Sequence, residues 1–355
     1  MAALLVCTLY HITQGQVWHL VYVDDFLSIL PAETYPEYVT LITLWLIALG
    51  APLSWKKTFV GQINTWLGFA INTIKGTLQV SADKIRPFPD ILEAITTVTP
   101  QTAHTLEKWA GTLNWATIAS MVLRPYLYHI YTWLMVAKQH GRCLPSTSTK
   151  KLAALMIKVL NMPPPKHTAY YRRQTVVGAT DAAGYDEKSD RKGCIGGWWT
   201  PGTAEDKSEV LWFSIDIDRT ETWAYKERSS QRRIAALELM GTLVLLKLMQ
   251  QEGHLARVHL TTPVATDNKG NAYGLGSGRF KKWPQADIVL ELAVTCHMAQ
   301  INIGACHVKR ASNTWADDLA DGKTDGFDPS LRRHFDLEDD GNWIIWQTLK
   351  QTAPT

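Results

Sequence analysis

Two acidic residues in the second half of the chain follow stretches that have the composition of buried strands. Asp181 follows Val176-Val177-Gly178-Ala179-Thr180, and Asp267 follows Val264-Ala265-Thr266. β-Branched and small apolar residues favour central strands, so both patterns predict a carboxylate delivered to a strand end. An aspartate at such a position can also close a turn by bonding to its own backbone, and that alternative stays open for each residue taken alone.

Two further acids lie in segments that read as helices. Glu238 is flanked by Ile234-Ala235-Ala236-Leu237 and Leu239-Met240, a pattern that is apolar on nearly every face. A glutamate buried there is costly unless it is paired or bound to a metal, although it could also be ion-paired near a surface. Asp317 lies near the start of a short helical segment, where an acid also suits the helix dipole.

Carboxylate oxygens are the ligands that Mg²⁺ prefers, and neither His nor Cys is needed in such a set. We therefore interpret Asp181, Glu238, Asp267 and Asp317 as one site for Mg²⁺, with Mn²⁺ as a substitute. Two such ions can activate a water and stabilise the leaving oxygen of a phosphodiester.

The surrounding pattern indicates an α/β fold that mixes strands with helices. Strands are expected at 176–180, 195–200 and 210–215 as an antiparallel meander, and later at 258–262, 264–266 and 301–307. Helices are expected at 230–249, 283–300 and 314–321. Such alternation predicts a sheet flanked by helices, although Pro263 makes the strand before Asp267 uncertain.

The four acidic motifs together resemble those of type 1 ribonuclease H, in the same order. They are Thr180-Asp181-Ala182-Ala183-Gly184, Leu237-Glu238-Leu239-Met240, Thr266-Asp267-Asn268 and the segment from His307 to Ala320 that contains Asp317. The resemblance implies that the four acids bind metal and that the substrate is an RNA–DNA hybrid. It also implies that His307 assists proton transfer or product release. The sequence departs from the family pattern at Arg310, where the family commonly has glycine. The alternative is that His307 is a plain strand-end histidine.

The first half of the chain has a different pattern, with two apolar runs, 17–23 and 26–30, on either side of Asp24-Asp25. This spacing predicts a hairpin with acids at its tip. A helix is expected at 36–49, strands at 59–61, 66–71 and 77–80, and helices at 90–97, 101–119 and 125–138, the second of them capped by Thr99-Pro100. Residues 141–168 read as a connector with one short helix.

Several motifs of this half resemble reverse transcriptases of retroelements. Tyr22-Val23-Asp24-Asp25 resembles their catalytic hairpin, Gly50 to Lys57 their lysine motif, Trp66-Leu67-Gly68-Phe69 their primer grip, and Leu106 to Trp115 their helical thumb. The resemblance implies that Asp24 and Asp25 are catalytic metal ligands and that RNA template and DNA primer are partners. The implied domains are a partial polymerase palm (1–85), a thumb (86–140), a connector (141–168), a ribonuclease H-like domain (169–325) and a tail (326–355).

The polymerase resemblance is incomplete, because such enzymes need a further aspartate on an earlier strand. Residues 1–23 contain no Asp or Glu. The chain therefore resembles the C-terminal portion of such a polymerase, and we expect no primer extension unless a separate N-terminal part is supplied as a partner.

Bulk composition adds limited information. The net charge is +3, so a nucleic-acid interface must rest on local clusters such as Arg228, Arg232 and Arg233, Arg279, Lys281 and Lys282, or Lys309 and Arg310. The five cysteines contain no C-x-x-C pair, and the apolar run 39–49 is too short to span a bilayer. These features predict a soluble intracellular protein without a membrane partner.

The favoured hypothesis is a ribonuclease H that cuts the RNA strand of RNA–DNA hybrids and is attached to an incomplete RNA-directed DNA polymerase. The alternative is a retrotransposon relic that binds nucleic acid without catalysis. An unrelated metal-dependent nuclease is a third possibility, which the polymerase-like motifs argue against.

Overall fold

The structure is a computed structural model, and it divides into two compact units, Met1–Ile74 and Lys75–Thr355. The described residues are 2–81, 84, 86–97, 99–117, 122–161, 177–184, 193–202, 204–217, 230–255 and 261–350. Each unit is described by itself below.

The first unit contains helix α1 (Ala2–Ile12), the hairpin β1 (Trp18–Tyr22) and β2 (Asp25–Ile29), helix α2 (Tyr35–Ala48), and the hairpin β3 (Ile63–Trp66) and β4 (Phe69–Asn72). Its buried apolar side chains among the described residues are Leu9, Val17, Leu46 and Phe69. This core is small because, in the part of this unit that the structure describes, only two α-helices are available to cover two short hairpins.

Three details of the first unit differ from the sequence prediction. The tip of the first hairpin is Val23-Asp24, because Asp25 already pairs with Tyr22 in the ladder. Residues 66–71 are not one strand, since Leu67 and Gly68 have positive φ and form the turn between β3 and β4. Residues 59–61 are irregular. Short apolar runs do not reveal a turn by periodicity alone.

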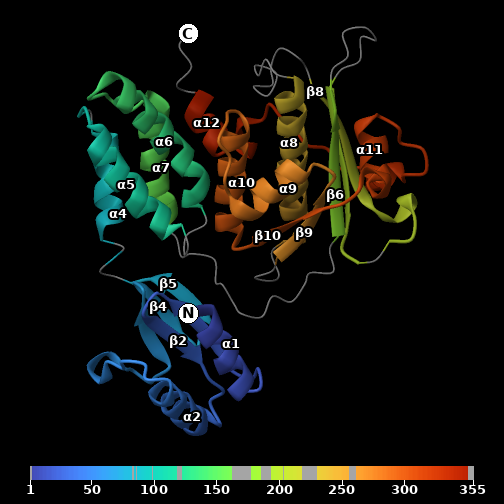
Figure 1. Ribbon diagram of the computed structural model, residues 1–355. Coiled ribbons are helices and arrows are strands. Elements are labelled where there is room, and N and C mark those ends of the chain that lie inside the picture. Colours follow the sequence, from blue (N-terminus) through green and yellow to red (C-terminus); the bar gives the residue numbers. More distant parts are fainter. Residues whose placement is uncertain are drawn as a thin grey trace. The chain divides into compact units, whose positions relative to one another are not determined.

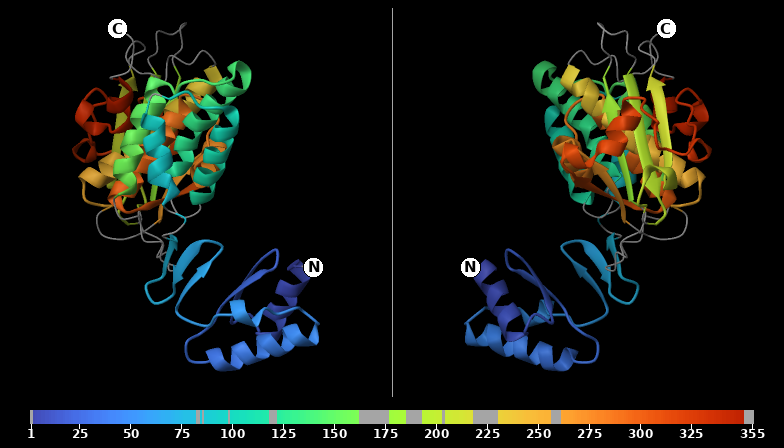
Figure 2. Two further views of the ribbon diagram at one scale, coloured as in Figure 1. Left: turned by 90° about the vertical axis from the view of Figure 1, so that its left-hand side faces the viewer. Right: turned by 90° about the vertical axis from the view of Figure 1, so that its right-hand side faces the viewer.

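The second unit begins with strand β5 (Thr77–Val80) and continues with four helices, α4 (Pro87–Thr96), α5 (Ala103–Ala116), α6 (Leu123–His140) and α7 (Thr147–Leu160). Helix α5 packs on α6 and α4 packs on α7, and Figure 2 shows them gathered on one side of this unit. The predicted cap Thr99-Pro100 was wrong, because Thr102 caps α5 by accepting a hydrogen bond from the Thr105 N–H. The helix expected to be a short piece of the connector has 14 residues and belongs to this bundle.

A five-stranded sheet has the order β10-β9-β6-β7-β8. Strands β6 (Val177–Ala183), β7 (Gly193–Thr200) and β8 (Leu211–Ile217) form the predicted antiparallel meander. Strand β9 (Thr261–Thr266) runs parallel to β6 and to β10 (Asn302–His307). Pro263 lies inside β9, and residues 258–260 of the strand predicted at 258–262 lie outside the described part of the chain. The sheet therefore places β6, which carries Asp181, at its centre.

Helices cover both faces of this sheet. Helix α8 (Ser230–Gln251) packs on β6 and β7 with α10 (Gln285–Ala299) behind it, whereas α11 (Thr314–Ala320) packs on the same strands from the other face (Figure 1). Helix α9 (Lys269–Ser277) follows β9 directly. The fold class is therefore mixed α/β, as predicted.

Helix α8 is apolar on all sides because it is a core helix. Its segment Arg233–Gln251 is long and apolar enough to cross a membrane, but 78% of that window is buried inside the protein. Burial of most of its surface removes the need for a polar face.

The C-terminal tail is part of the same core. Phe335 and Trp343 pack edge to face and are buried in the main apolar cluster, and the short helix α12 (Ile345–Lys350) contacts α10 and α7. The tail thus closes the side of the unit where α10 meets the helical bundle.

Candidate metal centre

The structure brings three of the four predicted acids together. Asp181 on β6, Glu238 on α8 and Asp267 after β9 each offer a carboxylate oxygen, and these oxygens all lie within 4.8 Å of one another. Asp181 is 6% exposed and Glu238 is 7% exposed, while Asp267 is half-buried. Asp181 was expected at the end of its strand, but it lies inside β6, opposite Gly196 of β7.

Close packing of α8 on β6 sets the position of Glu238. Thr242 lies one turn after Glu238 on α8, and its hydroxyl oxygen shares a hydrogen bond of 3.1 Å with the hydroxyl oxygen of Thr180 on β6. A Cβ at Gly241 would lie 3.4 Å from the Thr180 side chain, an ordinary van der Waals contact, so the helix lies directly against the strand at this point. Glu238 is thereby held over the same strand that carries Asp181.

Asparagines hold Glu238 in place. The Asn271 side-chain amide donates to Glu238 Oε2 at 2.9 Å and to the Ala235 carbonyl at 2.9 Å. Asn268 caps α9 by accepting a hydrogen bond from the Asn271 N–H at 3.1 Å, and its side chain also hydrogen-bonds to Glu238. Sequence reasoning missed Asn271, although the spacing Asp267-Asn268-(x)2-Asn271 at a helix start could have indicated it.

Burial and mutual repulsion favour the protonated forms of two acids when no cation is bound. Burial raises the pKa of Asp181 to about 7, a hydrogen bond from the Ala182 N–H opposes this, and the charges of Asp267 and Asp317 add to it. Burial likewise raises the pKa of Glu238 to about 8, with the asparagine hydrogen bonds opposing and the charges of Asp181 and Asp267 adding. Converging buried carboxylates are therefore unfavourable without a compensating cation.

The donor set fits a hard divalent cation. Its members are carboxylates only, they come from three separate elements, and two of them are deeply buried. Oxygen ligands of this kind suit Mg²⁺ and Mn²⁺ better than softer metals. Asp181, Glu238 and Asp267 are the residues that would hold it.

Asp317 lies beside this group rather than inside it. Its Oδ1 accepts a hydrogen bond from the Arg310 guanidinium at 2.9 Å, and its side chain is 33% exposed. The charges of Asp317 and Arg310 both act on Asp181, the first raising and the second lowering its pKa. Asp317 thus borders the site and is paired with the Arg310 guanidinium.

Helix α11 reaches this position because β7 has glycine at the contact. A Cβ at Gly196 would lie 2.3 Å from the Ala320 nitrogen and 2.4 Å from the Leu319 carbonyl carbon, both backbone atoms. The Asn313 side-chain amide, 2% exposed, donates to the Thr180 carbonyl at 3.3 Å and joins the helix start to β6. Gly196 and Asn313 therefore position Asp317 relative to Asp181.

His307 lies at the end of β10 with an exposed side chain. Its Nε2 is 3.1 Å from the backbone carbonyl oxygen of Asp267. The predicted histidine is thus adjacent to one of the three converging acids.

Asp24 and Asp25 are exposed at the β1–β2 hairpin. Within the part of the chain that the structure describes, no third acid, His or Cys joins them in a metal-binding group. Their role as polymerase ligands stays a prediction.

The predicted basic clusters are described in part. Arg279, Lys281, Lys282, Lys309 and Arg310 have exposed side chains. Arg228 and the Arg232 side chain lie outside the described residues.

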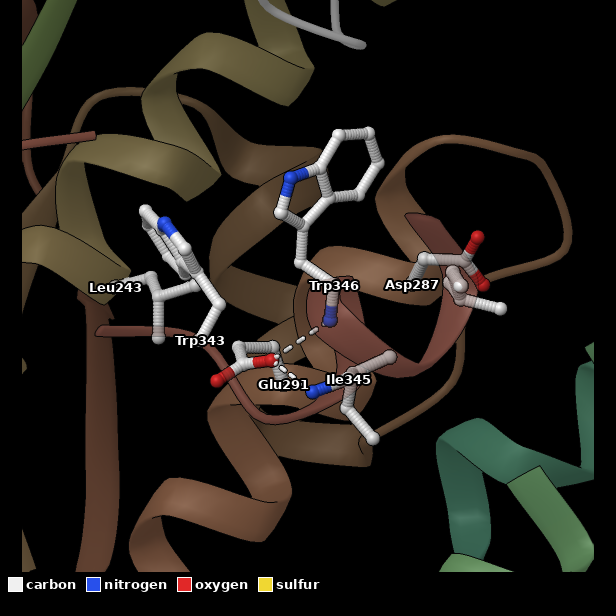
Figure 3. Close-up of a pocket in the computed structure, with 7 residues that line it drawn as sticks. Leu243, Asp287, Glu291, Trp343, Ile345 and Trp346 are labelled. Carbon is white, nitrogen blue, oxygen red and sulfur yellow. Dashed lines mark hydrogen bonds between the residues drawn. The ribbon is translucent and has the colours of Figure 1, made fainter. Parts of the chain in front are cut away.

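Another buried carboxylate, Glu291 of α10, has a structural role. It accepts hydrogen bonds from the backbone N–H groups of Ile344, Ile345 and Trp346, and it pairs with Lys247 at 3.0 Å. Figure 3 shows Glu291 in a small pocket lined in part by the tail, with its hydrogen bonds to the backbone N–H groups of Ile345 and Trp346. Glu291 binds the C-terminal tail and is fully partnered, unlike the acids of the metal centre.

Comparisons with known proteins concern the fold. No protein-family model matches the chain, and no curated protein matches it. Among solved structures, the chain is similar to LC11-RNase H1 isolated from compost, with 16% identity over 43% of this chain and 96% of that chain at a TM-score of 0.30. RNase H1 from the archaeon Halobacterium salinarum NRC-1 has 16% identity over 42% of this chain and 97% of that chain, at a TM-score of 0.29.

A longer match extends over both units. The foamy viral protease-reverse transcriptase, solved in complex with dsDNA, has 16% identity over 86% of this chain and 58% of that chain, at a TM-score of 0.36. The chain thus spans little more than half the length of that protein.

Proposed function

We propose that the unit Lys75–Thr355 is a Mg²⁺-dependent nuclease that hydrolyses the RNA strand of RNA–DNA hybrids. The observation that supports this best is the convergence of Asp181, Glu238 and Asp267, which come from three separate elements. A structural explanation for three close acids would require a cation paired directly with them, as Lys247 is paired with Glu291, whereas the nearby Arg310 pairs directly with Asp317. Among the described contacts of the three acids, the side-chain hydrogen bonds come from neutral asparagines.

Each residue has a distinct task in this proposal. Asp181 and Glu238 provide buried oxygens for a cation, Asn271 fixes the orientation of Glu238, and Asp267 completes the set from the half-exposed side. In this proposal the exposed His307, whose ring contacts the Asp267 backbone carbonyl, would carry a proton between the site and solvent. When bound, the cations would activate a water and stabilise the leaving oxygen.

The choice of hybrid as substrate rests on the four-motif resemblance, since a two-metal site alone does not select a nucleic acid. A hybrid can be recognised by 2′-hydroxyls on one strand and their absence on the other. Exposed Lys309 lies two residues after His307 and is available for phosphate contact.

The test compares cleavage of labelled RNA in a hybrid, plain RNA duplex and plain DNA duplex by the full chain with Mg²⁺ or Mn²⁺. Asp181→Asn is expected to reduce hybrid cleavage by at least about a thousandfold, on the order of what loss of a central catalytic group costs, while hybrid binding persists. Asp318→Asn is the matched control, because Asp318 lies on the same helix as Asp317 but pairs with Lys207 at 2.7 Å. It should leave cleavage unchanged.

Two outcomes would contradict the proposal. Equal cleavage by the Asp181→Asn variant would place the activity elsewhere or in a contaminant. Hybrid binding without cleavage by the unchanged chain would favour the alternative, a non-catalytic nucleic-acid-binding relic.

For the first unit we propose a partial polymerase palm, on the Tyr22-Val23-Asp24-Asp25 resemblance alone. Primer extension by the full chain, with and without Asp24→Asn, measures whether the hairpin contributes to any synthesis. No extension is expected from this chain by itself.

A further inference from the structure

An exposed arginine, Arg310, forms an ion pair with Asp317, the fourth predicted acid, which borders the candidate metal centre. Arg310 opens the short 3₁₀ turn Arg310–Ser312, and Asp317 lies on α11, which follows at once. The guanidinium donates to Asp317 Oδ1 at 2.9 Å, although the Arg310 side chain is 78% exposed. The contact is therefore made by the tip of a long side chain whose stem is mostly in solvent.

Such a contact is easily exchanged. Ion pairs between exposed side chains contribute little to stability, because solvent screens them and ordering two side chains costs entropy. A divalent cation at the same carboxylate carries twice the charge without that side-chain ordering. A cation can therefore bind Asp317 Oδ1 only when the Arg310 guanidinium has moved away from that oxygen.

Arg310 also acts beyond its direct partner. Its charge interacts favourably with Asp181 and Asp267 as well as with Asp317. It therefore offsets part of the repulsion among the acids in the metal-free protein, and this benefit is lost when a cation takes its place.

We propose that Arg310 is a displaceable counter-ion that competes with a divalent cation for Asp317, and so lowers the affinity of the site for that ion. This inference rests on the proposed metal-dependent function and adds a residue that tunes it. Arg310 is a positioning residue in this account, since it acts through Asp317.

The direct test is calorimetric titration of the full chain with Mn²⁺ alone, without nucleic acid. Arg310→Gln is expected to bind Mn²⁺ up to about fivefold more tightly than the unchanged chain, as expected from losing a competing surface ion pair. Arg310→Lys should lie between the two, because it keeps the charge but loses the guanidinium geometry. Lys309→Gln is the matched control, since it removes one positive charge from the neighbouring exposed residue.

A double-mutant cycle separates competition at Asp317 from a general charge effect. In an Asp317→Asn background, Arg310→Gln should change Mn²⁺ affinity no more than Lys309→Gln does. Thermal melting in EDTA gives a second reading: Arg310→Gln should melt slightly lower than the unchanged chain and gain more from added Mn²⁺.

The outcomes distinguish this inference from the proposed function. If the unchanged chain binds Mn²⁺ and Asp181→Asn abolishes that binding, but Arg310→Gln behaves like Lys309→Gln, then the competition is wrong and the metal centre stands. If the unchanged chain shows no Mn²⁺ binding that depends on Asp181, the proposed function itself fails.

Discussion

Two buried glutamates show how a structural carboxylate differs from a candidate metal ligand. Glu291 is 3% exposed and has Lys247 and a set of backbone N–H groups as partners. Glu238 is 7% exposed and faces two more acids, with only neutral amides donating to it among the described contacts. The free energy of burying a charge is offset in the first case and not in the second, so only Glu238 calls for a cation.

This difference predicts how stability depends on pH when metal is removed. The pKa values of Asp181 and Glu238 are raised to about 7 and about 8, from ordinary values of 3.8 and 4.5. An unfolded chain releases these protons near pH 4, whereas the folded chain keeps them to pH 7 or 8. The free energy of unfolding in EDTA should therefore fall as pH rises from about 4 to about 8.

The measurement is the urea midpoint at pH 5 and pH 8 in EDTA. Glu238→Gln should raise the midpoint at pH 8 and change it little at pH 5, because it removes the charge that is unfavourable only at high pH. Asp90→Asn, at an exposed carboxylate of α4, serves as the control and should have nearly equal effects at both values. A Glu238→Gln variant that is less stable than the unchanged chain at pH 8 would refute this account.

Asn271 gives a second prediction for single residues. Replacing it with alanine removes the amide that orients Glu238 Oε2 and leaves the Ala235 carbonyl without that donor. Because residues that orient ligands typically contribute about 10–100-fold to metal affinity, Mn²⁺ binding should weaken by about tenfold. Asn161→Ala, at an exposed asparagine that ends α7, should leave Mn²⁺ affinity unchanged. An unchanged affinity in Asn271→Ala would mean that Glu238 is oriented by other contacts.

At the scale of elements, the contact between α11 and β7 decides whether Asp317 reaches the site. The Leu319 carbonyl of α11 accepts a hydrogen bond from Ser214 Oγ at 2.8 Å, so the helix backbone itself is joined to the sheet. Such an approach leaves no room for a side chain at Gly196.

Gly196→Ala should therefore displace α11 and lower the free energy of unfolding by about 1–3 kcal/mol, the usual effect of overpacking. Hybrid cleavage should fall further than stability alone explains, because Asp317 moves with the helix. Gly202→Ala is the matched control, since a Cβ there has no atom within 4 Å. Equal stability of the two variants in urea would show that α11 does not lie against Gly196.

At the scale of the whole molecule, the helices α4–α7 belong to the same compact unit as the sheet. His129 of α6 and Asp287 of α10 form a buried contact of 2.9 Å, each residue being 8% exposed. Arg124 of α6 donates to the Ser277 carbonyl at the end of α9 at 3.1 Å. The finer partition at 140 and 168 stays a prediction.

This organisation predicts two unfolding transitions in calorimetry, one for Met1–Ile74 and one for Lys75–Thr355. His129→Leu should affect only the second transition. It should lower the free energy of unfolding of Lys75–Thr355 by about 3 kcal/mol, because it leaves the buried Asp287 carboxyl without its partner. Lys138→Ala is the control, because Lys138 lies on α6 like His129 but forms only an exposed ion pair with Glu107 of α5 at 2.6 Å, so the second transition should change little. A separate transition for the helical bundle would contradict the single unit.

The sequence by itself determined the local elements around the site. A helix that is apolar on nearly every face predicts burial of the glutamate within it, and small and β-branched runs before Asp181 and Asp267 predict strands, because periodicity and composition report burial. The meander, the core helix and the α/β class followed from these patterns.

Only the tertiary structure decided which side chains meet. Asn271 reaches Glu238 from 33 positions away, Gly196 makes room for α11, and Arg310 pairs with Asp317, a contact that neither residue's neighbours indicate. The hairpin tip at Val23-Asp24 likewise depended on strand register. Periodicity shows which face of an element is buried, whereas partners across elements depend on how the elements pack, and side-chain hydrogen bonds require that geometry to within tenths of an ångström.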